Sequence, residues 1–475
     1  MINVLHVSAE VSPFVKIGGL ADVVGSLPNE IKRLKNADVR VILPYYKSIP
    51  SKYKSKVLDV VNFKFDFEYE EQYVGVKSLK KGNILYYFID NEFYFGSRDN
   101  VYNYGDEGKR FAYFQLAVLE SLKHLDFTPD IIHIHDWHTG MIPLLLKTKY
   151  RNYKIKTVLS LHNLAYQGVF PLQDYSMFNI EYDSRFEFDG NLNFLKAGIV
   201  TADVITTVSP NYAQEILTDY YGYGMQNLLK ARGSDLIGVL NGIDYKEFSP
   251  DNDKLIAYKF DISDYKIKKR ENKAALFKML KVDFDLDRPL ISIISRLVNQ
   301  KGIDLIQRVF SEMLQRDDFS FVCLGSGEEV YESYFKELEA KYPDKVKVYI
   351  GYSNKMAHQI YAGSDMFLMP SKFEPCGLGQ IIALKYGTIP IVRETGGLVD
   401  TIESYNEYEK LGNGFSFKNF NAHDMMHSIR YALHTYKFDS VSWDKLIKNA
   451  MSEDFSWKKS ALQYKEIYKG LLTGK

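Results

Sequence analysis

Short apolar segments alternate with helical patterns along the whole chain of 475 residues, and this alternation limits the possible folds more than any other feature. Several segments are continuous runs of branched apolar residues, which is typical of parallel strands covered by helices on both faces. The pattern predicts a doubly wound α/β architecture. The expected strands are Val4–Val7, Val39–Leu43, Ile131–His135, Thr157–Leu161, Val204–Val208, Ile237–Leu240, Leu290–Ile294, Phe319–Leu324, Val346–Ile350, Met366–Met369 and Ile389–Val392.

The alternation starts again after the segment Asn241-Gly242-Ile243-Asp244, with a new strand near Leu290. Since the chain is longer than one ordinary domain, we predict an N-terminal domain over residues 1–245 and a C-terminal domain over residues 246–455. We expect a ligand cleft at the carboxyl ends of both sheets. A last helix, within residues 456–475, is expected to pack back on the N-terminal domain. Residues 173–195 have weak periodicity and are expected to form an insertion on that domain.

Composition indicates an ordinary soluble globular protein, with 46% apolar and 25% charged residues. The 60 basic and 60 acidic residues give a formal net charge of +0, which argues against a nucleic-acid partner. No apolar run reaches membrane-spanning length, and the first residues are typical of a strand rather than of a signal peptide. The two cysteines fit a reducing compartment. We therefore expect a cytoplasmic protein without a membrane partner, whose oligomeric state is left open.

Three turns that suit an anion follow predicted strands, and they are divided between the two halves of the chain. Glycines let backbone N–H groups approach an anion at the start of a helix, and cations stabilise a diphosphate whose charge grows as a sugar leaves. Each turn alone is equally consistent with an ordinary strand-to-helix connection; together they predict a bound diphosphate. The turns are Lys16-Ile17-Gly18-Gly19, Ser295-Arg296-Leu297 with Gln300-Lys301-Gly302, and Glu394-Thr395-Gly396-Gly397-Leu398.

An acidic residue, Glu374, lies in the segment Pro370–Leu378, which follows another predicted strand. A carboxylate at this place can accept hydrogen bonds from sugar hydroxyls or stabilise an oxocarbenium-like centre. The backbone N–H groups of Cys376–Leu378 are expected to face the same ligand. For Cys376 itself we favour a small packed residue over a nucleophile, because no His/Asp arrangement supports the latter.

A cluster of histidines ends the strand Ile131–His135 and continues to His138. Alternation places His133 and His135 on one face of the strand, which makes a zinc site conceivable. We favour hydrogen-bonded roles in the core and at the cleft wall, because the strand is expected to be buried and no helical His pair is present. Asp136, just past the strand, is the better cleft candidate. His162, after the next strand, can bond the transferring sugar or the departing oxygen.

Taken together, these segments resemble those of bacterial glycogen synthases and plant starch synthases, in the same order and over nearly the whole chain. That family has the GT-B fold, in which two Rossmann-like domains face each other across a deep cleft. The matching segments are Ser8-Ala9-Glu10, Lys16–Val23, His135–Gly140, His162–Gly168, Leu195–Gly198, Val208–Pro210, Asn241–Asp244, Ser295–Leu297, Gln300–Gly302, Pro370–Leu378, Tyr386–Thr388 and Thr395–Leu398.

The resemblance implies a retaining glucosyltransferase that moves glucose from ADP-glucose to the non-reducing end of an α-1,4-glucan, elongating glycogen. It implies no metal and no cofactor, since ADP-glucose is a substrate, and no enzyme nucleophile. The residue roles that it implies are donor contact for Lys16, Gly18, Gly19 and Asp22; neutralisation of the pyrophosphate by Arg296 and Lys301; sugar binding by Glu374 beside Cys376, Gly377 and Leu378; a place near the sugar O6 for His162; further cleft roles for Asp136 and Asn241; stacking on adenine for Tyr352; and backbone contacts from Thr395, Gly396 and Gly397.

Three positions depart from the family pattern. Ile17 replaces Thr or Val before the paired glycines, Ile382 stands where the broader family often has a second glutamate, and Glu394 stands where a basic residue is common. The last change bears on donor affinity rather than on the reaction class. Two alternatives stay open: a related transferase that uses UDP-glucose or a small acceptor, and a non-catalytic glucan-binding protein.

Overall fold

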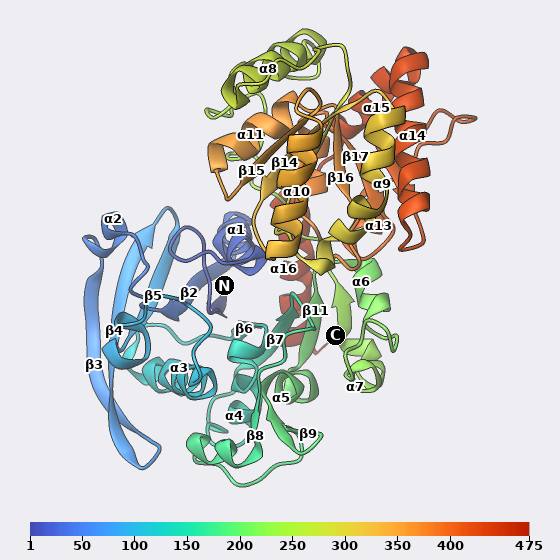
Figure 1. Ribbon diagram of the computed structural model, residues 1–475. Coiled ribbons are helices and arrows are strands. Elements are labelled where there is room, and N and C mark those ends of the chain that lie inside the picture. The colour runs from blue at the N-terminus through green and yellow to red at the C-terminus, as the bar shows by residue number, and fades with distance from the viewer. Residues whose placement is uncertain (475) are drawn as a thin grey trace. The chain divides into compact units, whose positions relative to one another are not determined.

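The computed structural model describes residues 1–474 and divides the chain into two compact units. Unit 1 comprises Met1–Gly242 and the segment from Trp457 onward, whereas unit 2 comprises Ile243–Ser456. The first strand and the last helix therefore belong to the same unit (Figure 1). No helix among residues 1–474 combines the length and the apolar character needed to cross a membrane.

A nine-stranded sheet forms the centre of unit 1, in the order β12-β11-β7-β6-β1-β2-β5-β4-β3. Seven neighbouring strands, from β12 to β5, pair in parallel, and β4 is antiparallel to both β5 and β3. The strands are β1 (Ile2–Val7), β2 (Ala37–Pro44), β3 (Leu58–Phe67), β4 (Glu70–Lys81), β5 (Ile84–Asp90), β6 (Ile131–His135), β7 (Lys156–Leu161), β11 (Val204–Thr207) and β12 (Leu236–Gly238).

Helices connect these strands, and the last helix of the chain packs against the first one. This last helix, α16 (Trp457–Thr473), buries Trp457, Ala461, Tyr464 and Tyr468 in unit 1. The other helices of unit 1 are α1 (Gly19–Arg33), α2 (Ser51–Lys54), η1 (Glu92–Gly96), α3 (Glu107–Ser121), η2 (Leu122–His124), η3 (Trp137–Thr139), α4 (Ile142–Lys147), α5 (Phe194–Thr201), α6 (Pro210–Glu215), α7 (Gln226–Ala231) and η5 (Gly233–Asp235).

The segment expected to form an insertion contains a short helical stretch, η4 (Leu172–Phe178), and two strands of a small antiparallel sheet. The sheet has the order β8-β10-β9, with β8 (Val169–Pro171), β9 (Glu187–Phe188) and β10 (Asn191–Asn193).

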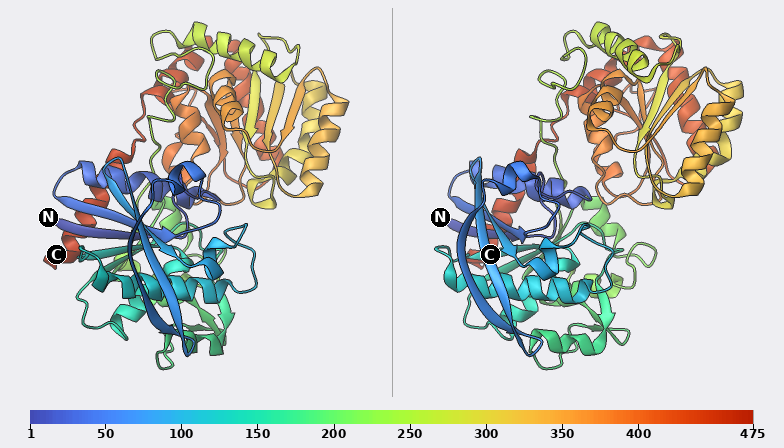
Figure 2. Two further views of the ribbon diagram at one scale, coloured as in Figure 1. Left: turned by 90° about the vertical axis from the view of Figure 1, so that its left-hand side faces the viewer. Right: turned by 60° about the vertical axis from the view of Figure 1, so that its left-hand side comes forward.

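Unit 2 is built on a six-stranded parallel sheet with the order β15-β14-β13-β16-β17-β18, and Figure 2 shows helices on both of its faces. The strands are β13 (Leu290–Ile294), β14 (Ser320–Gly325), β15 (Val346–Ile350), β16 (Met366–Met369), β17 (Ile389–Arg393) and β18 (Phe415–Phe417). The helices are α8 (Tyr265–Leu280), η6 (Asn299–Lys301), α9 (Ile303–Arg316), α10 (Glu329–Lys341), α11 (Asn354–Gly363), α12 (Gly379–Lys385), α13 (Gly397–Thr401), α14 (Ala422–Phe438) and α15 (Ser440–Ser452).

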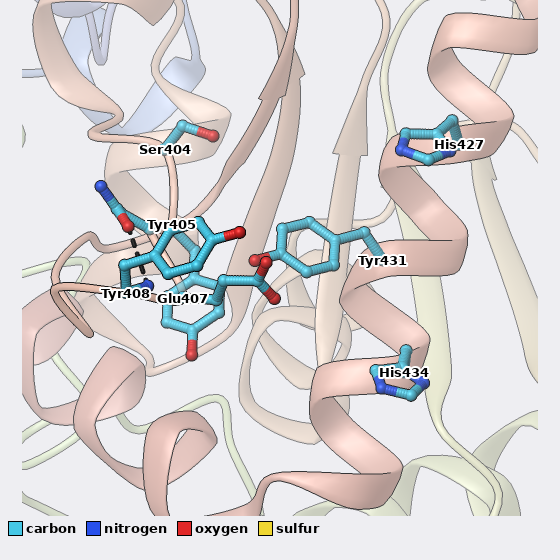
Figure 3. A pocket seen from close by; sticks show the side chains of 8 residues that line it. Ser404, Tyr405, Glu407, Tyr408, His427, Tyr431 and His434 are labelled. Carbon is cyan, nitrogen blue, oxygen red and sulfur yellow. Dashed lines mark hydrogen bonds between the residues drawn. The ribbon is translucent and has the colours of Figure 1, made fainter.

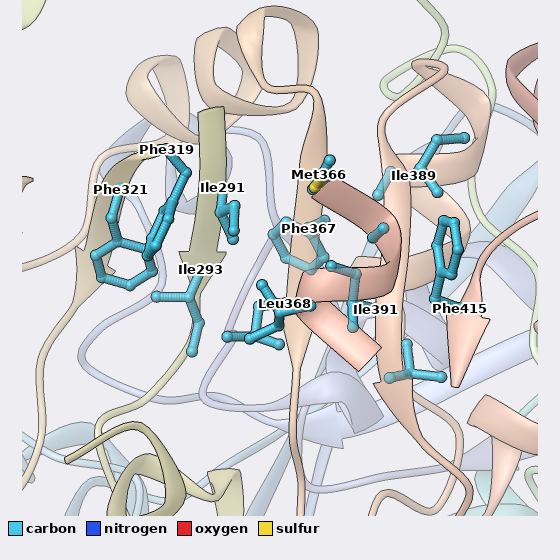
Figure 4. Packing of buried hydrophobic residues seen from close by; sticks show 14 of the residues in the cluster. Ile291, Ile293, Phe319, Phe321, Met366, Phe367, Leu368, Ile389, Ile391 and Phe415 are labelled. Atoms are coloured by element: carbon cyan, nitrogen blue, oxygen red, sulfur yellow. The ribbon is translucent and has the colours of Figure 1, made fainter. Parts of the chain in front are cut away.

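Apolar side chains from both faces of the central strands form the core of unit 2 (Figure 4). Ile291 on β13 and Phe367 on β16 are fully buried, as are Ile389 and Ile391 on β17. A strand that is covered on both faces needs apolar residues at successive positions, because neither face meets water. This is the reason that the predicted ranges of β6, β13 and β16 coincide with the observed ones.

We predict that Phe367→Ala lowers the free energy of unfolding by about 3–5 kcal/mol, because it leaves a cavity in the middle of the unit 2 core. Phe438→Ala is the matched control, since Phe438 is 68% exposed at the end of α14, and it should change stability by less than about 0.5 kcal/mol. Urea unfolding followed by circular dichroism measures both. Equal losses in the two variants would contradict this account of the core.

Candidate active site

The polar groups of unit 1 gather where the neighbouring strands β1, β6 and β7 end. Glu10 follows β1, Asp136 follows β6 and His162 follows β7. Because these strands are parallel, their carboxyl ends lie at one edge of the sheet. Predicted site residues far apart in the sequence are therefore brought to one edge of unit 1.

Glu10 holds the turn that leads into α1. Its Oε2 accepts the backbone N–H groups of Ile17 at 2.7 Å and Gly18 at 2.9 Å, and its Oε1 accepts the hydroxyl of Tyr102 at 2.6 Å. A carboxylate at the start of a helix is also favoured by the helix dipole. The Gly18 N–H, which we expected to face a diphosphate, thus donates to Glu10. The sequence interpretation missed this role, although Glu10 lies in the first matching segment.

Lys16 and Asp22 form an ion pair of 2.7 Å beside this turn. A Cβ atom added to Gly18 or Gly19 would meet no atom within 4 Å, and Gly18 has an extended backbone with φ of −140°. Neither close packing nor a left-handed backbone therefore requires glycine at these two positions. Their lack of side chains leaves the backbone beside Lys16 open to an approaching group.

Asp136 links the ends of β6 and β7. Its backbone has φ of 55°, which is uncommon for a residue other than glycine, and its Oδ1 accepts the N–H of His162 at 2.7 Å. Burial raises the pKa of Asp136 from 3.8 to about 7. Asn241 lies at the end of unit 1, where its buried Oδ1 has no hydrogen-bond partner among residues 1–474.

Three buried imidazoles, those of His6, His133 and His135, have ring nitrogens within 4.8 Å of one another. All six of these nitrogens have hydrogen-bond partners. The His133 ring is tilted towards that of His6 and stacked on that of His135, with centroids 4.6 and 4.5 Å apart. This geometry fits the hydrogen-bonded roles that we favoured over a metal site.

In unit 2, an ion pair joins two of the predicted residues. Lys301, in the loop after β13, lies 2.5 Å from Oε2 of Glu374, in the loop after β16. Ser371 donates its hydroxyl to the same oxygen at 3.0 Å. Because β13 and β16 are neighbours, the sheet brings this pair together across 73 residues of sequence. The Glu374 carboxylate is buried, and Lys301 neutralises it.

Close backbone contacts fix the loops around this pair, and they explain three of the glycines. A Cβ atom on Gly302 would lie 2.0 Å from the carbonyl oxygen of Pro370, and one on Gly396 would lie 1.9 Å from that of Glu374. Both glycines have positive φ, of 69° and 48°. Gly397 approaches Cys376 in the same way and donates its N–H to the carbonyls of Glu374 and Pro375. The N–H of Gly397 therefore serves the loop itself.

The remaining predicted residues of unit 2 lie at the same edge of its sheet. Thr395 is buried after β17, and Arg296 is exposed after β13 without an ion pair in the described part of the chain. Cys376 is buried, and the N–H groups of Gly377 and Leu378 have no protein acceptor among residues 1–474. Tyr352 lies exposed in the loop after β15, two strands away from β13, and donates its hydroxyl to Asn354 at 3.1 Å.

A hollow of about 740 Å³ on unit 2 contains none of the predicted site residues (Figure 3). It lies between the loop of residues 404–408 and the helix α14, from which Tyr431 points towards the loop and His434 also lines the hollow. The candidate site of unit 2 is therefore identified from the loops at the strand ends and not from this hollow.

The chain matches two family models, one described as "Starch synthase catalytic domain" over residues 3–231 and one described as "Glycosyl transferases group 1" over residues 277–450. It is 48% identical to a glycogen synthase of Bacillus cereus (strain Q1), over 99% of this chain and 100% of that relative. It is also 48% identical to a glycogen synthase of Anoxybacillus flavithermus (strain DSM 21510 / WK1), over 100% of this chain and 99% of the relative.

Solved structures resemble the chain over its full length. The catalytic domain of starch synthase IV from Arabidopsis thaliana, bound to ADP and acarbose, superposes with a TM-score of 0.90 at 33% identity, covering 99% of both chains. A sucrose-phosphate synthase from Thermosynechococcus elongatus superposes with a TM-score of 0.64 at 14% identity, covering 100% of both chains, and shares the fold alone. These likenesses confirm the predicted class of two doubly wound α/β domains.

We predict that Asp136→Asn makes the protein more stable relative to the wild type as the pH rises from about 5 to about 8. Burial raises the pKa of Asp136 from 3.8 to about 7, so the native state binds more protons than the unfolded state in this window, and wild-type stability falls as the pH rises. Asparagine keeps the acceptor for the His162 N–H but does not titrate. Between about pH 5 and pH 8, the free energy of unfolding of the variant should rise by roughly 2–3 kcal/mol relative to that of the wild type.

Urea unfolding at a series of pH values, followed by tryptophan fluorescence, measures this difference, since Trp137 is next to Asp136. A difference between variant and wild type that stays constant with pH would show that Asp136 ionises normally.

Proposed function

Because the chain belongs to the family of bacterial glycogen synthases and plant starch synthases, and is a glucosyltransferase of glycogen synthesis, we propose that it transfers glucose from ADP-glucose to the non-reducing end of an α-1,4-glucan with retention of configuration. The observation that carries this proposal is the ion pair between the partly buried Lys301 and the buried Glu374, at neighbouring strand ends of unit 2. It provides a cation for a diphosphate directly beside an acceptor for sugar hydroxyls.

In the proposed reaction, Arg296 and Lys301 bind the diphosphate of the donor. Arg296 is exposed and Lys301 is already held by Glu374, so both are available at one sheet edge without rearrangement of the core. Their charges stabilise the leaving group most when its negative charge is fully developed. Glu374 accepts hydrogen bonds from the hexose, and the N–H groups of Gly377 and Leu378 are donors beside it. We assign Tyr352 to stacking on the adenine. We assign Thr395 and Gly396 to backbone contacts with the diphosphate.

We assign to unit 1 the contacts with the transferred sugar and with the glucan. Lys16, Gly18 and Gly19 are assigned to an anionic group, which the absence of side chains at the two glycines lets approach Lys16. The N–H of Gly18 stays with Glu10, and Asp22 holds Lys16 by their ion pair. His162 and Asp136 lie at adjacent strand ends and are assigned to the hexose. The unpartnered Oδ1 of Asn241 is assigned to a substrate hydroxyl.

The chemical step exchanges one C–O bond for another. The bond between the glucose C1 and the diphosphate oxygen breaks, and the acceptor hydroxyl forms the new bond on the face that the diphosphate leaves. The proton of that hydroxyl passes to the departing diphosphate, whose growing charge makes it the strongest base nearby. Retention then needs no covalent glucosyl-enzyme, in keeping with the buried position of Cys376 and the pairing of Glu374 with Lys301.

Several further assignments belong to this proposal. The relative from Arabidopsis thaliana that binds ADP and acarbose supports a nucleoside diphosphate and a glucan as ligands of this chain too. We propose that the reaction uses no cofactor and no metal. We also propose a cytoplasmic location, which suits two cysteines, Cys323 and Cys376, that are not joined in a disulfide.

We predict that the purified protein incorporates labelled glucose from ADP-glucose into precipitable glycogen, and that UDP-glucose or a small acceptor such as fructose 6-phosphate supports transfer at least about tenfold less well, a difference of about 1.4 kcal/mol in barrier. Radiolabel in polymer is the measurement. Label in a small product would favour the related-transferase alternative, and absence of any transfer would favour a non-catalytic glucan-binding protein.

We predict that Lys301→Ala lowers kcat by about two to three orders of magnitude, because one charge-assisted contact to the leaving group contributes about 2–4 kcal/mol. Lys336→Ala is the matched control, since Lys336 is exposed on α10 in the same unit. Thermal unfolding of both variants separates a lost contact from a lost fold. An unchanged kcat in a folded Lys301→Ala variant would remove Lys301 from the mechanism.

A further inference from the structure

The hollow between α14 and the loop that precedes β18 has aromatic rings on both of its walls (Figure 3). In α14, His427, Tyr431 and His434 follow one another at intervals of four and three residues, which places them on one face of the helix. In the loop, Tyr405 is buried, whereas Tyr408 is 89% exposed. The volume of about 740 Å³ falls within the range of small-molecule sites in proteins.

This hollow lies at the opposite edge of the unit 2 sheet from the candidate active site. Lys301 and Glu374 follow the carboxyl ends of β13 and β16, whereas the loop leads into the amino end of β18. Ser404 pairs with Gly414, just before β18, and a Cβ atom on Gly414 would lie 2.9 Å from the carbonyl oxygen of Pro390, at the start of β17. The five residues of β17 separate the two edges by roughly 16 Å. A ligand in the hollow is therefore not the sugar that reacts beside Glu374.

The chemistry of the lining limits the class of ligand. Five of the eight lining residues carry a ring, and the other three, Ser404, Asn406 and Glu407, are polar. In the described part of the chain, this lining contains no lysine, arginine or aliphatic residue. An anion such as a phosphate would find no lysine or arginine there and would meet the carboxylate of Glu407. An aliphatic segment would cover polar groups without forming hydrogen bonds with them.

A sugar fits both properties of the lining. A pyranose ring has a flat face of C–H groups, which packs on an aromatic ring, and a rim of hydroxyls, each of which can donate and accept hydrogen bonds. The rings of Tyr408 and Tyr431 provide the apolar surface. Glu407 and Ser404 provide partners for the hydroxyls, as do the ring nitrogens of the two histidines. The lining therefore matches a neutral carbohydrate.

The exposed loop has a fixed shape. Asn406 accepts the N–H of Tyr408 on its Oδ1 at 2.9 Å, and its backbone carbonyl accepts the N–H of Lys410 at 2.7 Å. Lys410 Nζ donates to Asp439 at 2.8 Å and to Ser442 at 3.0 Å, at the start of α15. A ring held on such a turn loses little conformational freedom when a ligand binds, and this lowers the cost of binding.

Tyr431, on the opposite wall, is held by its neighbours. Its ring contacts those of Tyr405 and Phe415, with centroids 5.8 and 5.4 Å away. Burial and the nearby carboxylate of Glu407 raise the pKa of Tyr431 to about 12, so its hydroxyl remains a donor at neutral pH. Both walls thus offer rings and hydrogen-bonding groups in defined positions.

We propose that this hollow is a second carbohydrate site, which binds an internal stretch of the α-1,4-glucan while a chain end of the same polymer reacts at the candidate active site. The inference rests on the proposed function, because it takes that polymer to be the acceptor. A branched polymer has many chain ends, so a protein held at one stretch meets further ends at a high effective concentration. The site therefore strengthens the binding of glycogen and leaves the chemical step unchanged.

Three variants test the binding. Tyr408→Ala removes an exposed ring from the hollow, and Tyr408→Phe keeps the ring. Tyr69→Ala is the matched control, because Tyr69 is 94% exposed in the turn between β3 and β4 of unit 1. Affinity electrophoresis of the full chain in native gels that contain glycogen measures binding without turnover. We expect the dissociation constant to rise about fivefold or more in Tyr408→Ala, and to stay within about twofold of the wild-type value in the other two.

Kinetics separate the hollow from the place where the acceptor end reacts. With glycogen, the KM of Tyr408→Ala should rise about fivefold or more, with kcat within about twofold of the wild-type value. With maltotriose as acceptor, both constants should stay within about twofold, because a short acceptor gains nothing from a hold at the opposite sheet edge. An equal rise in the KM for maltotriose would place Tyr408 at the reacting end and overturn the inference.

The inference and the proposed transfer reaction fail separately. Glycogen retardation that is weaker in Tyr408→Ala than in the wild type supports the second site whether or not transfer is found. Equal retardation of the wild type and Tyr408→Ala would overturn the second site even if ADP-glucose is used as proposed. A folded wild-type protein that glycogen does not retard would overturn it as well.

Discussion

Parallel pairing of strands that are buried on both faces is the constraint on which the rest of this structure depends. All strands of such a sheet end at the same edge, so the loops that follow them meet there even when they are distant in sequence. In unit 1 this edge collects Glu10, Asp136 and His162, and in unit 2 it collects Lys301 and Glu374. The chemistry of the enzyme can therefore vary in the loops while the apolar strands beneath them remain an ordinary core.

The second physical theme is that the buried carboxylates at these edges are held by defined partners. Glu10 is satisfied by two backbone N–H groups and a tyrosine, and Glu374 by a lysine and a serine. Burying a carboxylate without such partners costs several kcal/mol. Satisfied polar groups thus position the site.

Strands and residue roles were predicted correctly from the sequence where all residues of an element have the same environment. They were missed where the environment depends on one face of a strand or on a single partner residue. The strand at 366–369 was predicted correctly because both of its faces are buried. β3, at the edge of the sheet, and its neighbour β4 were missed, because both have many exposed positions and few continuous apolar runs. Gly396 and Gly397 were predicted to lie in an anion-binding turn, and the structure adds a packing reason for them, a close approach to the backbone at Glu374 and Cys376.

The sequence by itself determined the α/β class, the reaction family and most residues of the candidate site, because apolar periodicity and the order of motifs are written along the chain. Only the tertiary structure decided how those residues are paired. That Glu10 accepts the hydroxyl of Tyr102, that Lys301 neutralises Glu374, and that Tyr468 bonds His6 and His133 are contacts between distant segments. Such contacts depend on which strands and helices become neighbours, and no local pattern of residues specifies a hydrogen bond across hundreds of positions.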